Sequence, residues 1–136
     1  MKQKILTLFI VLFSTLSLTA NTNNSYQYYK AYQYSQRYVT DSGYWTSWSA
    51  WKQVNINITF DLTNDVIWIF SAKTQKYSVY SSDIYYDSDG EKVLRFYFVD
   101  QDGDKGHMRL MIRPSGTSQI YIDFSNMSWC YNVVRK

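Results

Sequence analysis

Three aspartates at alternate positions, Asp100, Asp102 and Asp104, are the side chains best suited to holding a metal ion. Carboxylates spaced in this way can converge on one hard cation such as calcium. An EF-hand loop beginning at Asp100 would need glycine at its sixth position and glutamate at its twelfth, and these places hold Lys105 and Met111. Because Asp and Gly also form hairpin turns, the sequence favours a simple turn and leaves the three aspartates as weak metal candidates.

A second acidic turn, formed by Asp87, Asp89 and Glu91 around Gly90, leaves one metal hypothesis open. If the two turns lay at the same end of the fold, their carboxylates could share an ion.

Residue groups that would support catalysis are not evident. The sequence has no serine-centred elbow, no phosphate-binding glycine loop and no metalloprotease helix motif. His107, the only histidine, is expected to face outward, and its neighbours in the sequence supply neither an orienting partner nor a nucleophile. A hydrolase would need two carboxylates that meet across turns, such as Asp83 and Asp100, and no spacing requires this. The sequence therefore predicts a protein that is not an enzyme and needs no cofactor.

The most distinctive candidate for binding is a run of tryptophans at every third position, Trp45, Trp48 and Trp51. The favoured interpretation is that these rings plug one end of the fold, and the alternative is an exposed platform for sugars or a partner protein. On an extended segment Trp48 would face away from Trp45 and Trp51, whereas on a helical turn all three would share a face.

A basic stripe is the second candidate surface. Arg95, Arg109, Arg113 and Lys92 occupy outward positions of neighbouring expected strands, interleaved with Tyr97 and Tyr121. A solvated face that Asp123 balances in charge is the favoured interpretation. The candidate ligand or partner contacts are therefore Trp45, Trp48, Trp51, Tyr97 and Tyr121.

The elements that must position these residues are strands, because apolar residues recur with period two. Val54, Ile56, Ile58 and Phe60 give the clearest alternation, and Asp-Gly pairs mark hairpin turns. The Tyr-rich N-terminal stretch is the least regular, since Lys30 interrupts its alternating tyrosines. The pattern predicts about eight strands, over residues 26–38, 54–60, 66–70, 77–80, 94–98, 108–112, 120–124 and 129–133. Two short strands over 26–38 and an extension of the fourth strand to residue 86 are the alternatives.

Short polar links between these strands favour antiparallel pairing of sequential neighbours. A meander of this many strands removes its exposed edges by closing into a barrel. We therefore predict an all-β fold, a single small up-and-down barrel or strongly curled meander, with a two-sheet sandwich as the alternative. Cys130 is the only cysteine, so no internal disulfide can form and large aromatic rings must supply the cohesion.

The first 20 residues are expected to be a signal peptide, with Lys2 and Lys4 before an apolar run and a small residue, Ala20, at the end. An uncut membrane anchor is the alternative. Residues 21–136 would then form one exported domain, periplasmic or secreted, that meets a membrane only through its signal peptide. Without Lys2 and Lys4 the chain carries 12 basic and 11 acidic side chains, a net charge of +1. No basic cluster supports nucleic-acid binding.

Two resemblances add to this picture. Gly43-Tyr44-Trp45 resembles the G-x-W motif that opens a lipocalin barrel, which implies that Arg113 or Arg135 caps the tryptophan ring. Thrombospondin type 1 repeats carry a similar tryptophan run, but they need several disulfides. More broadly, residues 45–134 resemble short exported bacterial β-rich proteins without an assigned function. That resemblance implies a lipocalin-like fold and an exported location, and no activity.

The expected function is non-enzymatic binding of an apolar or glycan ligand by the barrel or its aromatic end. The many large inward residues favour a filled interior, which counts against a carrier. The alternative is a protein-interaction factor or inhibitor that acts through its Tyr- and Trp-rich surface, with the N-terminal Tyr/Gln segment as its contact. In that case deletion of residues 25–39 would remove the partner and leave the domain folded.

Overall fold

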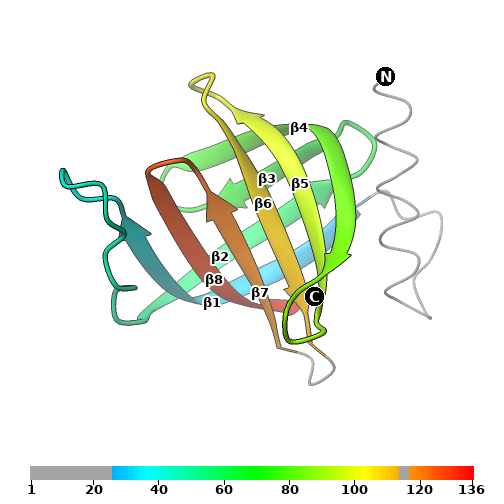
Figure 1. The fold of residues 1–136 in the computed structure, drawn as a ribbon. Helices are drawn as coiled ribbons and strands as arrows, with labels where there is room; N and C mark the ends of the chain where they lie inside the picture. The colour runs from blue at the N-terminus through cyan, green and yellow to red at the C-terminus, as the bar shows by residue number, and fades with distance from the viewer. Residues whose placement is uncertain (1–25, 114–116) are drawn as a thin grey trace.

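A computed structural model describes residues 26–113 and 117–136. They form eight antiparallel strands that close into one barrel (Figure 1). Each strand pairs with the next along the chain, and β1 pairs with β8. The strands are β1 (Tyr26–Tyr38), β2 (Lys52–Asp61), β3 (Val66–Phe70), β4 (Thr74–Tyr86), β5 (Lys92–Asp100), β6 (Lys105–Ile112), β7 (Ser118–Asp123) and β8 (Met127–Arg135). The predicted all-β barrel is confirmed, and the sandwich alternative is wrong because the sheet closes on itself.

The expected signal peptide over residues 1–20 lies outside the described residues. Within them, no helix has the length and apolar character that crossing a membrane would require.

Period-two alternation fills the barrel as the sequence predicts. Along β5, Leu94, Phe96 and Phe98 point inward and are fully buried, whereas Arg95 and Tyr97 point outward. The same alternation runs through the neighbouring strands, because only one face of each strand meets the core. The other fully buried apolar side chains are Ala31, Ile58, Phe60, Ile67, Ile69, Met108, Leu110, Ile120, Ile122 and Val133.

The tyrosines of β1 do not all lie on one face of the strand, although their alternation in the sequence would suggest it. Tyr26 and Tyr28 face outward and are exposed, whereas Tyr29 and Ala31 are buried inside. A bulge between Ala31 and Gln33 then shifts the register, so that Tyr34 lies inside the barrel. A shift of one residue exchanges the two faces of a strand, which is why one tyrosine series serves both faces.

β1 also closes the barrel. It pairs with β2 on one edge and with β8 on the other over most of its length. The N-terminal Tyr/Gln segment is therefore part of the framework, and deletion of residues 25–39 would open the barrel rather than remove a detachable contact.

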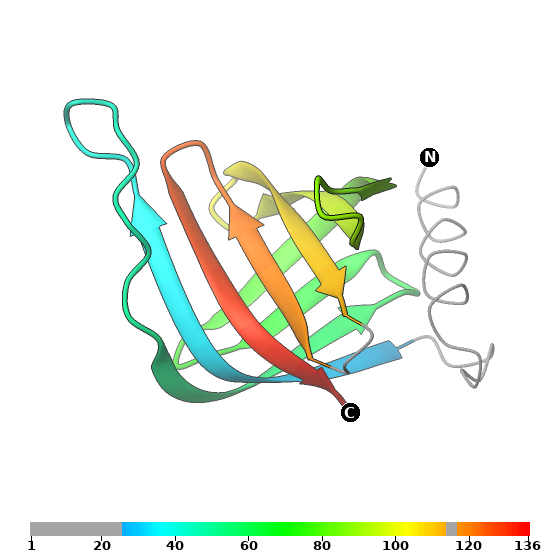
Figure 2. The ribbon, with the colours of Figure 1, turned by 60° about the horizontal axis from the view of Figure 1, so that its bottom comes forward.

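The hairpins divide the barrel into two ends. The β2–β3 and β4–β5 turns lie at one end, which we call the closed end. The β3–β4, β5–β6 and β7–β8 turns lie at the other, the open end (Figures 1 and 2). β5 separates the acidic turn around Gly90 from the turn around Gly103, so these turns lie at opposite ends. The hypothesis that their carboxylates share an ion is therefore wrong.

The β1–β2 connection, residues 39–51, forms an arm that projects beyond the open end (Figure 2). Backbone hydrogen bonds from Thr46 to Tyr38 and from Ser49 to Gln36 hold the returning chain against β1. Gly43 turns the arm at its tip with φ of 85°, a conformation that favours glycine.

Candidate functional site

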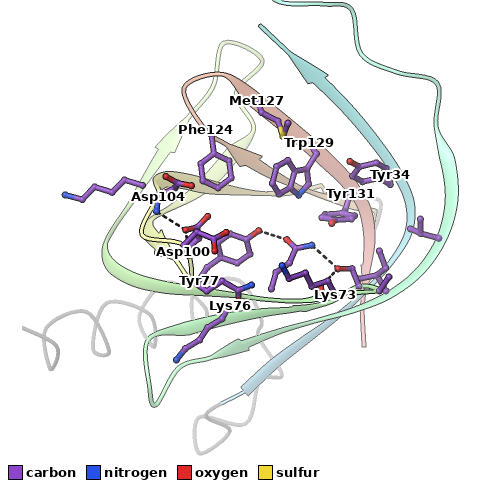
Figure 3. Close-up of a pocket in the computed structure, with 18 of the residues that line it drawn as sticks. Tyr34, Lys73, Lys76, Tyr77, Asp100, Asp104, Phe124, Met127, Trp129 and Tyr131 are labelled. Carbon is purple, nitrogen blue, oxygen red and sulfur yellow. Dashed lines mark hydrogen bonds between the residues drawn. The ribbon is translucent and has the colours of Figure 1, made fainter.

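A cavity of about 1160 Å³ occupies the open end of the barrel (Figure 3). Small-molecule sites commonly enclose about 300–1,000 Å³, so a ligand with several rings fits this volume. The fully buried rings of Phe60 and Phe96 contact each other in the core and are not part of the cavity lining. The expectation of a filled interior therefore holds for the core and is wrong for the open end.

Aromatic rings form one wall of the cavity. Tyr34, Phe124, Trp129 and Tyr131 come from β1, β8 and the β7–β8 turn, and Figure 3 shows them on the same side. The rings of Tyr34 and Tyr131 are 5.5 Å apart and tilted by 44°, and those of Phe124 and Trp129 are 5.6 Å apart and tilted by 38°. Such tilted pairs stabilise each other and hold the wall in shape.

The facing wall is polar. Tyr77 donates a hydrogen bond to Gln75, whose Nε2 donates to Ser71 Oγ at 2.9 Å. Ser71 Oγ in turn donates to the carbonyl oxygen of Lys73 at 2.6 Å. These hydroxyl and amide groups run along the start of β4 and the β3–β4 turn, from the buried Tyr77 toward the exposed rim. Burial raises the pKa of Tyr77 well above its usual range, with Tyr131 and Asp100 adding to the shift, so its hydroxyl is neutral at ordinary pH.

Charges around the cavity balance. Three lysines, Lys73, Lys76 and Lys105, and three aspartates, Asp100, Asp102 and Asp104, line it. Two of the lysines also make cation–π contacts with rings outside the cavity. Lys76 Nζ lies 5.6 Å from the centroid of the Trp68 ring, and Lys105 Nζ lies 6.0 Å from that of the Tyr80 ring. The site has no net charge with which to select an ionic ligand.

The aspartates of the β5–β6 turn stabilise the turn itself. Asp100 Oδ1 accepts the backbone N–H groups of Asp102 at 2.9 Å and Asp104 at 2.8 Å, and Gly103 has φ of 85°. In the described part of the chain, no three His, Cys, Asp or Glu side chains form a group that could hold a metal ion. This geometry is that of an Asx-type hairpin turn, which was the favoured interpretation.

The predicted binding residues Trp45, Trp48, Trp51, Tyr97 and Tyr121 do not line the cavity. The tryptophans sit on the arm with 37–44% of their surface exposed, so the expectation that they plug the barrel is wrong. Tyr97 and Tyr121 lie on the outer face, on β5 and β7.

Arg37 joins two of these rings, and a third ring contacts one of the two. The Arg37 guanidinium lies 4.5 Å from the centroid of the Trp45 ring and 4.7 Å from that of the Trp48 ring. The Trp48 and Tyr121 rings meet edge to face, with their centroids 5.9 Å apart. Trp45 and Trp48 thus share a face, because the arm is not a regular strand. The G-x-W segment lies on the arm after β1, whereas the lipocalin resemblance would place it at the start of the first strand.

The expected ring-capping arginines bind elsewhere. Arg113 contacts Glu91 at 3.4 Å and Gln119 at 3.1 Å, and Arg135 donates to Gln27. The capping role of Arg37 was missed, because the fold-back of the arm against β1 has no distinct sequence signature.

Asp123 balances one residue of the outward basic stripe, as predicted, and other acidic residues pair with Arg95 and Arg113. Arg109 binds Asp123 at 2.6 Å, and Arg95 binds Asp83 at 2.8 Å. His107 lies outward on β6 with Nε2 at 3.1 Å from Asp123. Because Asp83 is engaged by Arg95 on the outer face while Asp100 caps a turn at the open end, these two carboxylates do not meet as a hydrolase would require.

Sequence reasoning missed the cavity-lining residues Gln75, Tyr34 and Phe124 as site residues. One signal was present, since Gln75 is a polar residue in phase with the inward Tyr77 and Val79. A polar side chain at an inward position near a strand end is unusual in a packed core, and it fits a cavity lined by polar groups.

The chain matches no protein-family model, no curated protein and no solved structure, so the geometry of the barrel alone supports a functional conclusion.

Proposed function

We propose that this protein is an exported, non-enzymatic binding protein that takes up one small organic ligand, apolar or glycan, in the open end of its barrel. The observation that carries the proposal is the cavity of about 1160 Å³ between an aromatic wall and a polar wall. Ligand sites of this kind are concave and largely preformed, with a few placed polar groups that orient the ligand. Export rests on the sequence of the first 20 residues.

Binding is favoured over catalysis by the chemistry of the lining. Tyr77 is held neutral, and Asp100 is engaged in its turn. His107 and Cys130 lie outside the cavity lining. An acid–base mechanism needs a proton donor and acceptor aimed at the same ligand atom. Tyr77 and Asp100 do not provide them, because both are engaged within the chain.

Trp129 provides the test. Of the five tryptophans, all of them in the described part of the chain, Trp129 alone lines the cavity. We expect N-phenyl-1-naphthylamine, a neutral apolar probe, or a short neutral oligosaccharide to change the fluorescence of the wild-type protein. The change should vanish in Trp129→Phe and persist in Trp68→Phe, the matched outer-face control. A response carried equally by Trp68, or the lack of any response, would contradict the proposal.

A second candidate, a protein-interaction factor, is supported by the arm. Tyr44, Trp45 and Trp51 are exposed on this projecting segment, and Tyr38 is exposed beside it at the end of β1. Exposed Tyr and Trp rings are well suited to contact surfaces, since they offer area at low entropic cost. Replacement of Tyr44 and Trp45 by serine separates the two functions, because it would remove a partner contact and leave the cavity probe signal unchanged.

A further inference from the structure

The two walls of the cavity differ in chemistry, and this difference restricts the ligand beyond its size. Resting on the proposed function, we propose that the ligand is a neutral glycan, a short oligosaccharide whose sugar rings stack on the aromatic wall while its hydroxyls bind the polar wall.

The aromatic wall suits sugar rings. The Trp129 and Tyr131 rings lie beside each other along the inward face of β8, with Tyr34 next to Tyr131 and Phe124 next to Trp129. The π faces of such rings carry partial negative charge and attract the weakly positive C–H groups of a pyranose face. A tilted row of rings can follow the bends between successive sugar units.

The polar wall argues against an alkyl chain. Tyr77, Gln75 and Ser71 are joined by hydrogen bonds, and Gln75 also bonds with Tyr131, yet the oxygen atoms of these side chains keep further lone pairs that can accept hydrogen bonds. A lipid tail would cover these groups and remove their water without replacing its hydrogen bonds, and each group left unpaired weakens binding. Sugar hydroxyls both donate and accept, so they satisfy the same groups.

The charge balance argues against an ionic ligand. Carboxylate or phosphate ligands are usually held by clustered cations. Here three lysines and three aspartates line the cavity, and Lys76 and Lys105 lie over the outer rings of Trp68 and Tyr80. Three amide side chains, Asn55, Gln101 and Asn126, also line the cavity. Uncharged donors and acceptors of this kind suit a neutral polyol.

The test is isothermal titration calorimetry of the whole secreted chain with cellotriose, chitotriose and maltotriose, and in parallel with dodecanoate and N-phenyl-1-naphthylamine. We expect at least one trisaccharide to bind and dodecanoate not to bind. Gln75→Leu should weaken trisaccharide binding about tenfold, the effect of one lost hydrogen bond, and leave naphthylamine binding unchanged. Gln53→Leu, an exposed glutamine on β2 outside the cavity lining, is the matched control.

The outcomes separate the two proposals. If naphthylamine or dodecanoate binds and no trisaccharide does, the glycan inference is overturned while the binding function stands. If no probe of either kind binds, both fail. If a trisaccharide binds with equal affinity to wild type, Gln75→Leu and Trp129→Ala, it binds outside the cavity and the inference is also overturned. Circular dichroism identifies a variant that has not folded. If Trp129→Ala does not fold, the affinity of Gln75→Leu alone shows whether the trisaccharide binds inside the cavity.

Discussion

Asp123, on the outer face of β7, is a half-buried carboxylate with three polar partners. Its carboxylate accepts hydrogen bonds from Arg109 at 2.6 Å and Ser128 at 2.6 Å, and His107 lies at 3.1 Å. Burial alone would raise its pKa, but these hydrogen bonds outweigh burial and hold the pKa well below the usual 3.8. A group whose pKa falls on folding stabilises the fold at higher pH, and that contribution is lost as the pH drops below about 4.

We therefore expect Asp123→Asn to lower the free energy of unfolding by about 2–4 kcal/mol at pH 7, because it leaves the half-buried Arg109 without its partner charge. At pH 3 the difference between variant and wild type should be smaller. Urea unfolding at both pH values measures it. An equal difference at pH 3 and pH 7 would show that the charge of Asp123 is not the stabilising feature.

Cys130 is a second residue whose chemistry depends on burial. Its thiol is buried beneath the outer surface, and burial raises its pKa to about 12. Because the thiolate is the reactive form, we expect almost no reaction with Ellman's reagent at pH 8 in the folded protein and complete reaction in urea. Rapid reaction of the native protein would contradict the assignment of Cys130 as a packed, inert side chain.

At the scale of elements, the arm depends on Arg37. Its guanidinium lies between the rings of Trp45 and Trp48, and each such contact contributes about 0.5–1 kcal/mol at an exposed site. Arg37→Ala should therefore cost about 1–2 kcal/mol and shift tryptophan emission to longer wavelength, while probe binding in the cavity is unchanged. Emission spectra, with Arg113→Ala as the control, measure this. Loss of cavity binding would mean that the arm shapes the site.

Gly106 lets β6 pass close to its neighbours. A Cβ at this position would lie 2.5 Å from the backbone oxygen of Asp123 and 2.9 Å from the Phe98 ring. Since backbone cannot yield as a flexible side chain can, Gly106→Ala should destabilise the barrel by about 2–3 kcal/mol. Lys105→Ala, at the exposed neighbouring position, should change stability by less than about 0.5 kcal/mol. Thermal unfolding of both variants is the measurement, and equal midpoints would contradict the packing described.

The sequence predicted where the strands lie better than it predicted which of their side chains point inward. Strands with one buried face, such as β2 and β5, carry a clean period of two, and their inward residues were identified correctly. The inward residues of β1 could not be assigned in this way, because the bulge between Ala31 and Gln33 exchanges the two faces of the strand and has no recognisable sequence pattern. The pairing of Arg37 with the arm was equally hidden, since it depends on how residues 39–51 fold back.

At the scale of the whole molecule, burial keeps several tyrosines neutral, Tyr34 among them. Burial raises the pKa values of Tyr29, Tyr121 and Tyr131 to about 12, and that of Tyr77 further. A group whose pKa rises on folding stabilises the fold below its unfolded pKa, here 10.0, and the contribution is lost as the pH rises toward 12. We expect the urea midpoint to be constant from pH 7 to 9 and to fall steeply above pH 10.

Absorbance at 295 nm checks this alkaline transition. Part of the tyrosine absorbance should change near pH 10, the ordinary pKa of tyrosine, and a second part should change only as the barrel unfolds. A single transition in which every tyrosine ionises near pH 10 while the fold persists would contradict the burial described.

The closed barrel was predictable because short links and alternating strands leave few other arrangements. The cavity was not, since it depends on how three hairpins and the start of β2 spread around one end. Inward residues such as Val54, Ile56 and Trp129 look like core in the sequence, yet they line an open space.

The most direct test of the binding function is native mass spectrometry of the protein recovered from a bacterial periplasm without denaturation, compared with Val54→Trp. That substitution places a large ring inside the cavity, and Trp68→Ala on the outer face is the control. The binding account predicts a reproducible extra mass on wild type and Trp68→Ala that is lost in Val54→Trp, and it predicts that wild type stripped of this ligand regains the mass from the periplasmic extract. A bare chain mass for wild type that no extract changes, or an extra mass that Val54→Trp retains, would contradict it.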